Sequence, residues 1–135
     1  MTTDTAQTRY LEQTPHGFSN VVEVTGGRLV FITGQMAVDE TGTLVGPGDL
    51  RAQLVQVFEN LKTQLAVVGA TFDHVVKIST LAEVGFEENA QIFGEVRDQY
   101  VNLQKPPASA IILAPKLIHP GALVDIAVIA HLPQA

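Results

Sequence analysis

Asp125 is the ionisable residue that the sequence sets most clearly apart, because it interrupts an apolar segment that runs from Leu123 to Ala130. Burying a carboxylate costs free energy unless it is paired or hydrogen-bonded, and burial raises its pKa. A carboxyl group with a raised pKa can exchange a proton near neutral pH, as general acid–base catalysis requires. The alternative is that Asp125 lies near the start of a strand and meets only solvent or a lysine.

Ser109 is the second candidate, since it follows Pro106-Pro107 at the predicted start of a strand. Its hydroxyl could donate a hydrogen bond to a substrate or orient a water molecule. A serine nucleophile needs a positioned base, and the chain has neither a Ser-x-x-Lys nor a Gly-x-Ser-x-Gly pattern. Taken alone, a serine that bonds only backbone groups is the simpler interpretation.

The four histidines do not predict a metal site, because none has the H-x-H or H-E-x-x-H spacing of a ligand pair. We therefore expect no metal. His119 precedes the last predicted strand and could line a cleft, although a solvated loop histidine has the same pattern. The phosphate-binding patterns G-x-G-x-x-G and the P-loop are also absent, so we expect no nucleotide cofactor.

Composition excludes several classes of partner. The net charge is −6 and the eight lysines and arginines form no cluster, which argues against nucleic acids and anionic membranes. The first 20 residues are polar, and no apolar stretch approaches the roughly 20 residues of a membrane span, so we expect a cytoplasmic protein. Charged residues make up only 16% of the chain, against about 25% in a typical domain, which indicates a surface hidden in a homo-oligomer.

The residue pattern predicts a mobile arm over residues 1–14 and one domain over residues 15–135 with the element order ββαβαββ. Gly26-Gly27 predicts a hairpin turn between the first two strands. A helix is expected from a cap at Asp49 to a stop at Gly69, with an apolar stripe at helical spacing. The other elements are expected at 21–24, 29–33, 75–82, 86–100 (the second helix), 109–113 and 123–130.

The last predicted strand is apolar on both faces, as in strands buried from both sides. Two helices can cover only one face of a sheet, so a second subunit is expected to cover the other.

The order and spacing of short motifs from about Gly17 to Ala130 resemble the Rid family, the reactive intermediate deaminases, also called YjgF-like proteins. The resemblance rests on Gly17-Phe18-Ser19, Leu29 to Gln35 followed by Asp39, Gln53, Asn60-Leu61, Gly69-Ala70, Val75-Val76-Lys77, Pro107-Ala108, Val124-Asp125-Ile126 and Ile129-Ala130. It implies a chorismate-mutase-like α/β fold of the α+β type, with a mixed sheet and two helices on one face. It also implies a homotrimer with a central barrel and ligand clefts between subunits. The implied activity is hydrolysis of enamines and imines to 2-keto acids and ammonia without cofactor or metal.

The chain departs from the family pattern at four positions. Ser109 stands where deaminating members have an arginine that holds the substrate carboxylate, and Phe18 replaces a tyrosine. Phe93 lies near the position of an asparagine, and Asp125 replaces a glutamate. A hydroxyl cannot replace a bidentate, permanently charged guanidinium. These changes predict a more apolar pocket and a substrate that is more hydrophobic or lacks a free α-carboxylate.

We therefore expect catalytic roles for Asp125 and Ser109, and a substrate-binding set of Phe18, Thr33, Gln35, Phe93, Ala110 and His119. The predicted reaction is hydrolysis or tautomerisation of a reactive enamine, imine or related carbonyl compound. One alternative is a non-catalytic trimer that binds a metabolite in its clefts or binds a protein partner. A third interpretation, RNA cleavage, conflicts with the acidic charge and the lack of a histidine pair.

Overall fold

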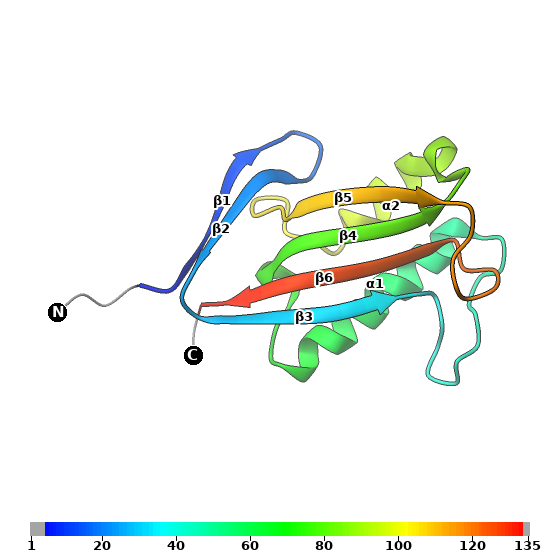
Figure 1. Cartoon of the computed structure of the whole chain (residues 1–135), viewed down its shortest axis with the longest axis horizontal. Helices are drawn as coiled ribbons and strands as arrows, with labels where there is room; N and C mark the ends of the chain where they lie inside the picture. Colours follow the sequence, from blue (N-terminus) through cyan, green and yellow to red (C-terminus); the bar gives the residue numbers. More distant parts are fainter. Residues whose placement is uncertain (1–4, 134–135) are drawn as a thin grey trace.

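The computed structural model describes residues 5–133 of the 135-residue chain. Its centre is a four-stranded sheet, in which the strands lie in the order β3 (Arg28–Gln35), β6 (Val124–Leu132), β4 (Val75–Glu83) and β5 (Ala108–Ala114). Strands β4 and β5 are parallel and the other pairs are antiparallel. Both α-helices lie behind this sheet (Figure 1). The elements are β1 (Gln7–Gln13), β2 (Ser19–Thr25), β3 (Arg28–Gln35), α1 (Leu50–Val67), η1 (Phe72–His74), β4 (Val75–Glu83), η2 (Phe86–Asn89), α2 (Ala90–Arg97), β5 (Ala108–Ala114) and β6 (Val124–Leu132). The mixed sheet with helices on one face confirms the predicted fold class.

Helix α1 forms where its apolar stripe and its caps predict it. The carboxylate of Asp49 accepts a hydrogen bond from the backbone N–H of Ala52 at 3.0 Å, and Gly69 follows the C-terminal cap with φ +74°. The stripe faces the sheet, and its largest ring, Phe58, is fully buried and stacks on Tyr100 with ring centroids 5.1 Å apart. This helix supplies five side chains to the core behind the sheet, namely Leu54, Val57, Phe58, Leu61 and Leu65.

The N-terminal strands differ from the prediction. Residues 7–13, expected within a mobile arm, form β1 and pair antiparallel with β2, while residues 1–4 lie outside the described residues. The Tyr10 hydroxyl donates to the carbonyl oxygen of Val75 at 3.2 Å, which ties β1 to the main sheet. The predicted hairpin between residues 21–24 and 29–33 is wrong. Gly26 and Gly27, both with positive φ, redirect the chain so that β3 pairs with β6.

The second helix is shorter than the predicted 86–100. A 3₁₀ turn, η2, precedes α2, and the helix ends at Arg97. After Arg97 the N–H groups of Gln99 and Tyr100 donate to carbonyl oxygens three residues back, those of Val96 and Arg97, as in a 3₁₀ turn, and the N–H of Val101 also donates to Arg97. The predicted apolar face still packs inward at Phe86, Phe93 and Val96.

The two faces of the sheet have different surroundings. Residues opposite one another on neighbouring strands share a face. Val128, Ile78 and Ser109 form one such row, and Val128 and Ile78 are buried beneath the helices. Asp125, Leu81 and Ile112 form a row on the other face, which we call the open face. Leu81 and Ile112 are exposed there, and so is Phe31 of β3, at 71%.

Candidate functional site

The structure sorts the predicted site residues into two groups at different places on the sheet. The first, which we call the Ser109 pocket, contains Phe18, Phe93, Ser109 and Ala110. The second, the Asp125 cluster, comprises Thr33, Gly34, Gln35 and Asp125, at the end of β3 and the start of β6.

The Ser109 pocket is a cleft of about 410 Å³ at the free edge of β5, bounded by α2 and by the turn that leads into β2. The start of β2 is fastened to the start of β5, because Ser19 donates from its hydroxyl to the Pro106 carbonyl at 2.6 Å and from its N–H to the Pro107 carbonyl at 3.0 Å. This places Phe18 beside Ser109. The full lining is His16, Phe18, Ala90, Phe93, Gly94, Arg97, Ser109, Ala110 and Ile111.

Phe93 forms the buried wall of this pocket and is only 3% exposed. Its ring contacts the rings of Phe58 and Phe86, with centroid distances of 6.4 and 5.8 Å. Core packing therefore fixes its orientation, and the pocket has a rigid aromatic wall.

Arg97 is the pocket residue that the sequence analysis missed. Its guanidinium carbon lies 5.5 Å from the centre of the Phe93 ring, its Nε donates to Oδ1 of Asp98 at 3.0 Å, and its Nη2 lies 2.9 Å from the same oxygen in an ion pair. The sequence could have indicated Arg97 as a pocket residue, because Phe93 and Arg97 are four residues apart on one helix and so share a face. The pocket is consequently less apolar than the replacement of arginine at position 109 predicted.

The Asp125 cluster lies where β3 loses its regular pairing with β6, at a register shift between Ile32 and Gln35. The Gln35 side-chain amide donates to the Thr33 carbonyl oxygen at 3.1 Å. Gly34 packs so closely against the Asp125 carboxylate that a Cβ atom at position 34 would collide with its Oδ1 atom. Backbone and carboxylate are thus in direct contact.

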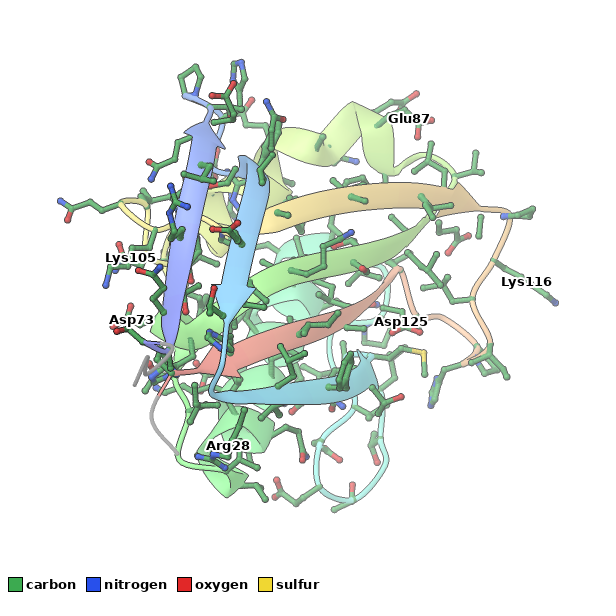
Figure 2. All side chains as sticks on the ribbon, turned by 60° about the vertical axis from the view of Figure 1, so that its left-hand side comes forward. Arg28, Asp73, Glu87, Lys105, Lys116 and Asp125 are labelled. Carbon is green, nitrogen blue, oxygen red and sulfur yellow. The ribbon has the colours of Figure 1, made fainter. Side chains whose placement is uncertain are left out.

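Asp125 is half-buried, and burial raises the pKa of its carboxyl group. Within residues 5–133 its carboxylate has no hydrogen-bond donor or cation as partner, so nothing offsets the cost of burying its charge. Figure 2 shows Asp125 at the end of β6 away from Lys105 and Asp73. This is the arrangement of a carboxyl group that can hold a proton at higher pH than an ordinary aspartate.

A single chain does not bring Ser109 and Asp125 together. Their rows lie on opposite faces of the sheet and are three residues apart along β4, roughly 10 Å, with two strand spacings between β5 and β6. His119 belongs to neither group. It lies half-buried in the loop before β6, with its Nδ1 atom 3.1 Å from the carbonyl oxygen of Pro120.

A larger cleft of about 670 Å³ contains none of the predicted site residues. It includes Arg28, Asp73 and Lys105, which Figure 2 shows at the end of the sheet away from Asp125. Over residues 5–133, no three His, Asp or Glu side chains gather into a group that could hold a metal ion. In the same range, none of the helices is both long and apolar enough to cross a membrane.

Two of the motif residues have structural roles. Gln53 is fully buried, donates to the carbonyl oxygens of Gly46 and Gly121, and accepts from the N–H of Leu123 at 2.8 Å. Asn60 donates to the carbonyl oxygens of two residues in the loop after β3, Met36 and Val38. Both amides fasten loops to α1, and the loop ending at Leu123 leads directly into the strand of Asp125.

Comparison with known proteins gives consistent results. The sequence profile described as Endoribonuclease L-PSP matches residues 10–132. Protein DfrA of Myxococcus xanthus is 35% identical over 114 residues, which is 84% of this chain and 83% of that protein. A RutC family protein of Pyrococcus abyssi is 33% identical over 70% of this chain and 71% of its own length.

Solved structures show the same relationship. A Rid family protein of unknown function from Yersinia pestis is 34% identical, with a TM-score of 0.77 over 95% of this chain and 99% of that one. RidA from an Antarctic Psychrobacter is 28% identical, with a TM-score of 0.69 over 95% and 98% of the two chains. The match over nearly all of the fold, together with the motifs from Gly17 to Ala130, makes this chain a member of the Endoribonuclease L-PSP family, to which the Rid and YjgF proteins belong.

Proposed function

We propose that this chain is a cytoplasmic, cofactor-independent enzyme that hydrolyses or tautomerises a reactive enamine, imine or related carbonyl compound. Membership of the Rid and YjgF family supports a protein that processes or binds small molecules. The observation that carries the catalytic part is the half-buried carboxyl group of Asp125, which has no partner among residues 5–133 and whose pKa is raised by burial. A raised pKa brings a carboxyl group closer to the range in which it both gives and takes protons.

The proposed active unit is a homotrimer in which the open face of each sheet packs against its neighbours. Three large apolar side chains are exposed on that face, namely Phe31 at 71%, Leu81 at 40% and Ile112 at 61%. Large apolar patches on a protein surface usually mark an interface, so this exposure supports packing against another subunit. Asp125 lies on the same face, whereas Ser109 lies at the free edge of β5. In this proposal the Asp125 cluster of one subunit completes the Ser109 pocket of the next.

The proposed reaction uses Asp125 in both protonation states. The protonated acid gives a proton to the β-carbon of an enamine, which becomes an iminium ion. Water then adds to the iminium carbon as the carboxylate takes up one proton of that water, which gives a carbinolamine. The acid next protonates the amino group of the carbinolamine, the C–N bond breaks as the hydroxyl proton returns to the carboxylate, and ammonia leaves a carbonyl product. The sum is enamine plus water to carbonyl compound plus ammonia. Ser109 donates a hydrogen bond to an oxygen atom of the substrate.

A non-catalytic role is the second candidate, in which the trimer binds a metabolite in its clefts or binds a protein partner. It is favoured by Ser109 and Phe18, which stand in place of the arginine and tyrosine of deaminating relatives. Cleavage of RNA, the activity in the family's name, is not supported by a net charge of −6.

The test is ammonia release from an enamine that a dehydratase generates in the assay. We expect the wild-type protein to accelerate release, and Asp125→Asn to lower the rate roughly a hundredfold or more, the range for loss of a general acid–base group. The exposed carboxylate of Glu40 supplies the control, and Glu40→Gln should leave the rate unchanged. No acceleration by the wild type, or an Asp125→Asn variant as fast as Glu40→Gln, would leave the binding role as the better account.

A further inference from the structure

We infer that Arg97 makes the Ser109 pocket an anion-binding site, which selects small carboxylates with an apolar body. The inference deepens the proposed function, on which it rests for the pocket's role as substrate site. It assigns the charge recognition to a helix residue and not to the strand residue at position 109.

The guanidinium of Arg97 is held in place from three sides. Its carbon lies 5.5 Å from the centre of the Phe93 ring, and Asp98 accepts a hydrogen bond from its Nε and forms an ion pair with its Nη2. On the third side it lies against Gly17, where a Cβ atom would collide with the Nη2 atom. Gly17 has a backbone φ of +83°, which residues other than glycine rarely adopt. A side chain that is only 12% exposed is thus fixed before any ligand binds.

The guanidinium keeps donors for a ligand. It carries five N–H groups, and the hydrogen bond to Asp98 uses the one on Nε. Within residues 5–133 the remaining N–H groups, on Nη1 and Nη2, have no hydrogen-bond acceptor, and Arg97 lines the same cleft as the hydroxyl-bearing Ser109. The guanidinium of Arg97 and the hydroxyl of Ser109 can donate hydrogen bonds to the two oxygens of a carboxylate.

The rest of the lining determines the body of the ligand. Phe18, Phe93, Ala110 and Ile111 present rings and alkyl groups to the cleft. An anion with a short apolar chain satisfies both parts, whereas a neutral analogue offers the guanidinium no second negative charge beside that of Asp98. Hydrogen bonds to a charged partner are about twice as strong as neutral ones.

Asp98 is a built-in competitor for the ligand. Its side chain is 43% exposed, so water screens its attraction for Arg97. Removing its charge should therefore strengthen binding of an external carboxylate, which is opposite in sign to the effect of removing Arg97.

The experiment measures binding of 2-oxobutanoate and of its neutral amide, 2-oxobutanamide, by isothermal titration calorimetry. We expect the wild type to prefer the carboxylate at least tenfold, Arg97→Gln to lose that preference, and Asp98→Asn to bind the carboxylate more tightly than the wild type. The matched control is Arg51→Gln, which removes another cation, one paired with Glu95 and 50% exposed outside the pocket. It should stay within about twofold of the wild type.

A wild type that binds neither probe or shows no preference would overturn the inference, as would a preference that survives Arg97→Gln. If Arg97→Gln does not fold, Asp98→Asn serves as the test instead, and carboxylate binding weaker than that of the wild type would overturn the inference. The proposed function fails separately, since the calorimetry needs no turnover. If the preference for the carboxylate depends on Arg97 but no enamine is hydrolysed, the anion site stands and the proposed enzymatic function is rejected. If enamine is hydrolysed but the carboxylate is not preferred, the enzymatic function stands and the anion site is rejected.

Discussion

The two faces of the sheet are made from the same strands, and along β6 they differ residue by residue. Val124, Ile126 and Val128 point toward the helices and are at most 2% exposed, while Asp125 and Ala127 between them point to the open face and are half-buried. The helix-covered face is completed by this chain alone. The open face exposes large apolar side chains such as Phe31. Folding stability is therefore concentrated on the helix-covered face, and the proposed subunit interface, together with the environment of Asp125, lies on the open face.

The largest expected effect is on the helix-covered face. Phe58→Ala should lower the free energy of unfolding by about 3–5 kcal/mol, because it removes a fully buried ring that contacts Phe72, Phe93 and Tyr100. Urea denaturation followed by circular dichroism measures this loss. The control is Val67→Ala at a position 76% exposed, with an expected change within about 0.5 kcal/mol. A loss below about 1 kcal/mol for Phe58→Ala would show that the helices do not hold this face as described.

On the open face, Phe31→Lys should change assembly and leave the subunit folded. Each buried phenylalanine contributes about 1.5–3 kcal/mol, and a buried ammonium adds a cost, so association should weaken at least tenfold. Sedimentation velocity at micromolar concentration should show the wild type as a trimer and the variant shifted toward monomer. The matched control, Val67→Lys, places the same charge at an exposed position at the end of α1. Equal sedimentation of all three proteins would contradict the proposed interface.

The smallest effect concerns the charge of Asp125. Burial raises its pKa in the folded chain above the unfolded value, so the folded state binds this proton more readily. Ionisation then lowers stability as the pH rises through the folded-state pKa. Asp125→Asn should therefore be more stable than the wild type at pH 7, and the difference should vanish below the unfolded value of about 3.9. Urea titrations of both proteins from pH 3 to 8 test the sign. A variant less stable at pH 7 would mean that the carboxylate has a favourable partner.

Local signals predicted the elements more reliably than their pairing. The stripe from Leu50 and the Asp49 cap determine α1 through contacts within a few residues, and the sequence was sufficient to find it. The partner of β2 depends on contacts between distant segments, such as Tyr10 with Val75. Gly26-Gly27 has the composition of a hairpin turn, yet here it joins two strands with different partners.

The candidate site shows the same limit. Phe18 and Phe93 were predicted from the resemblance to the Rid family and Ser109 also from its place at the start of a strand, and the fold places all three, with Ala110, in one pocket. The alternation along β6 was not enough to show that Asp125 faces away from Ser109, because the segment was apolar at both phases. An alignment of position 109 with its relatives does not point to Arg97, because Arg97 reaches the pocket of Ser109 from α2 and not from β5.

The buried amide of Gln53 has a consequence for how this molecule opens. This one side chain is hydrogen-bonded to the carbonyl groups of Gly46 and Gly121 and to the N–H of Leu123. Two loops that are far apart in the chain are therefore held by the same amide. Neither loop can detach without exposing a fully buried polar group, and they should therefore fluctuate as one cooperative unit. Motion at the start of β6, where Asp125 lies, is thus coupled mechanically to the segment that leads into α1.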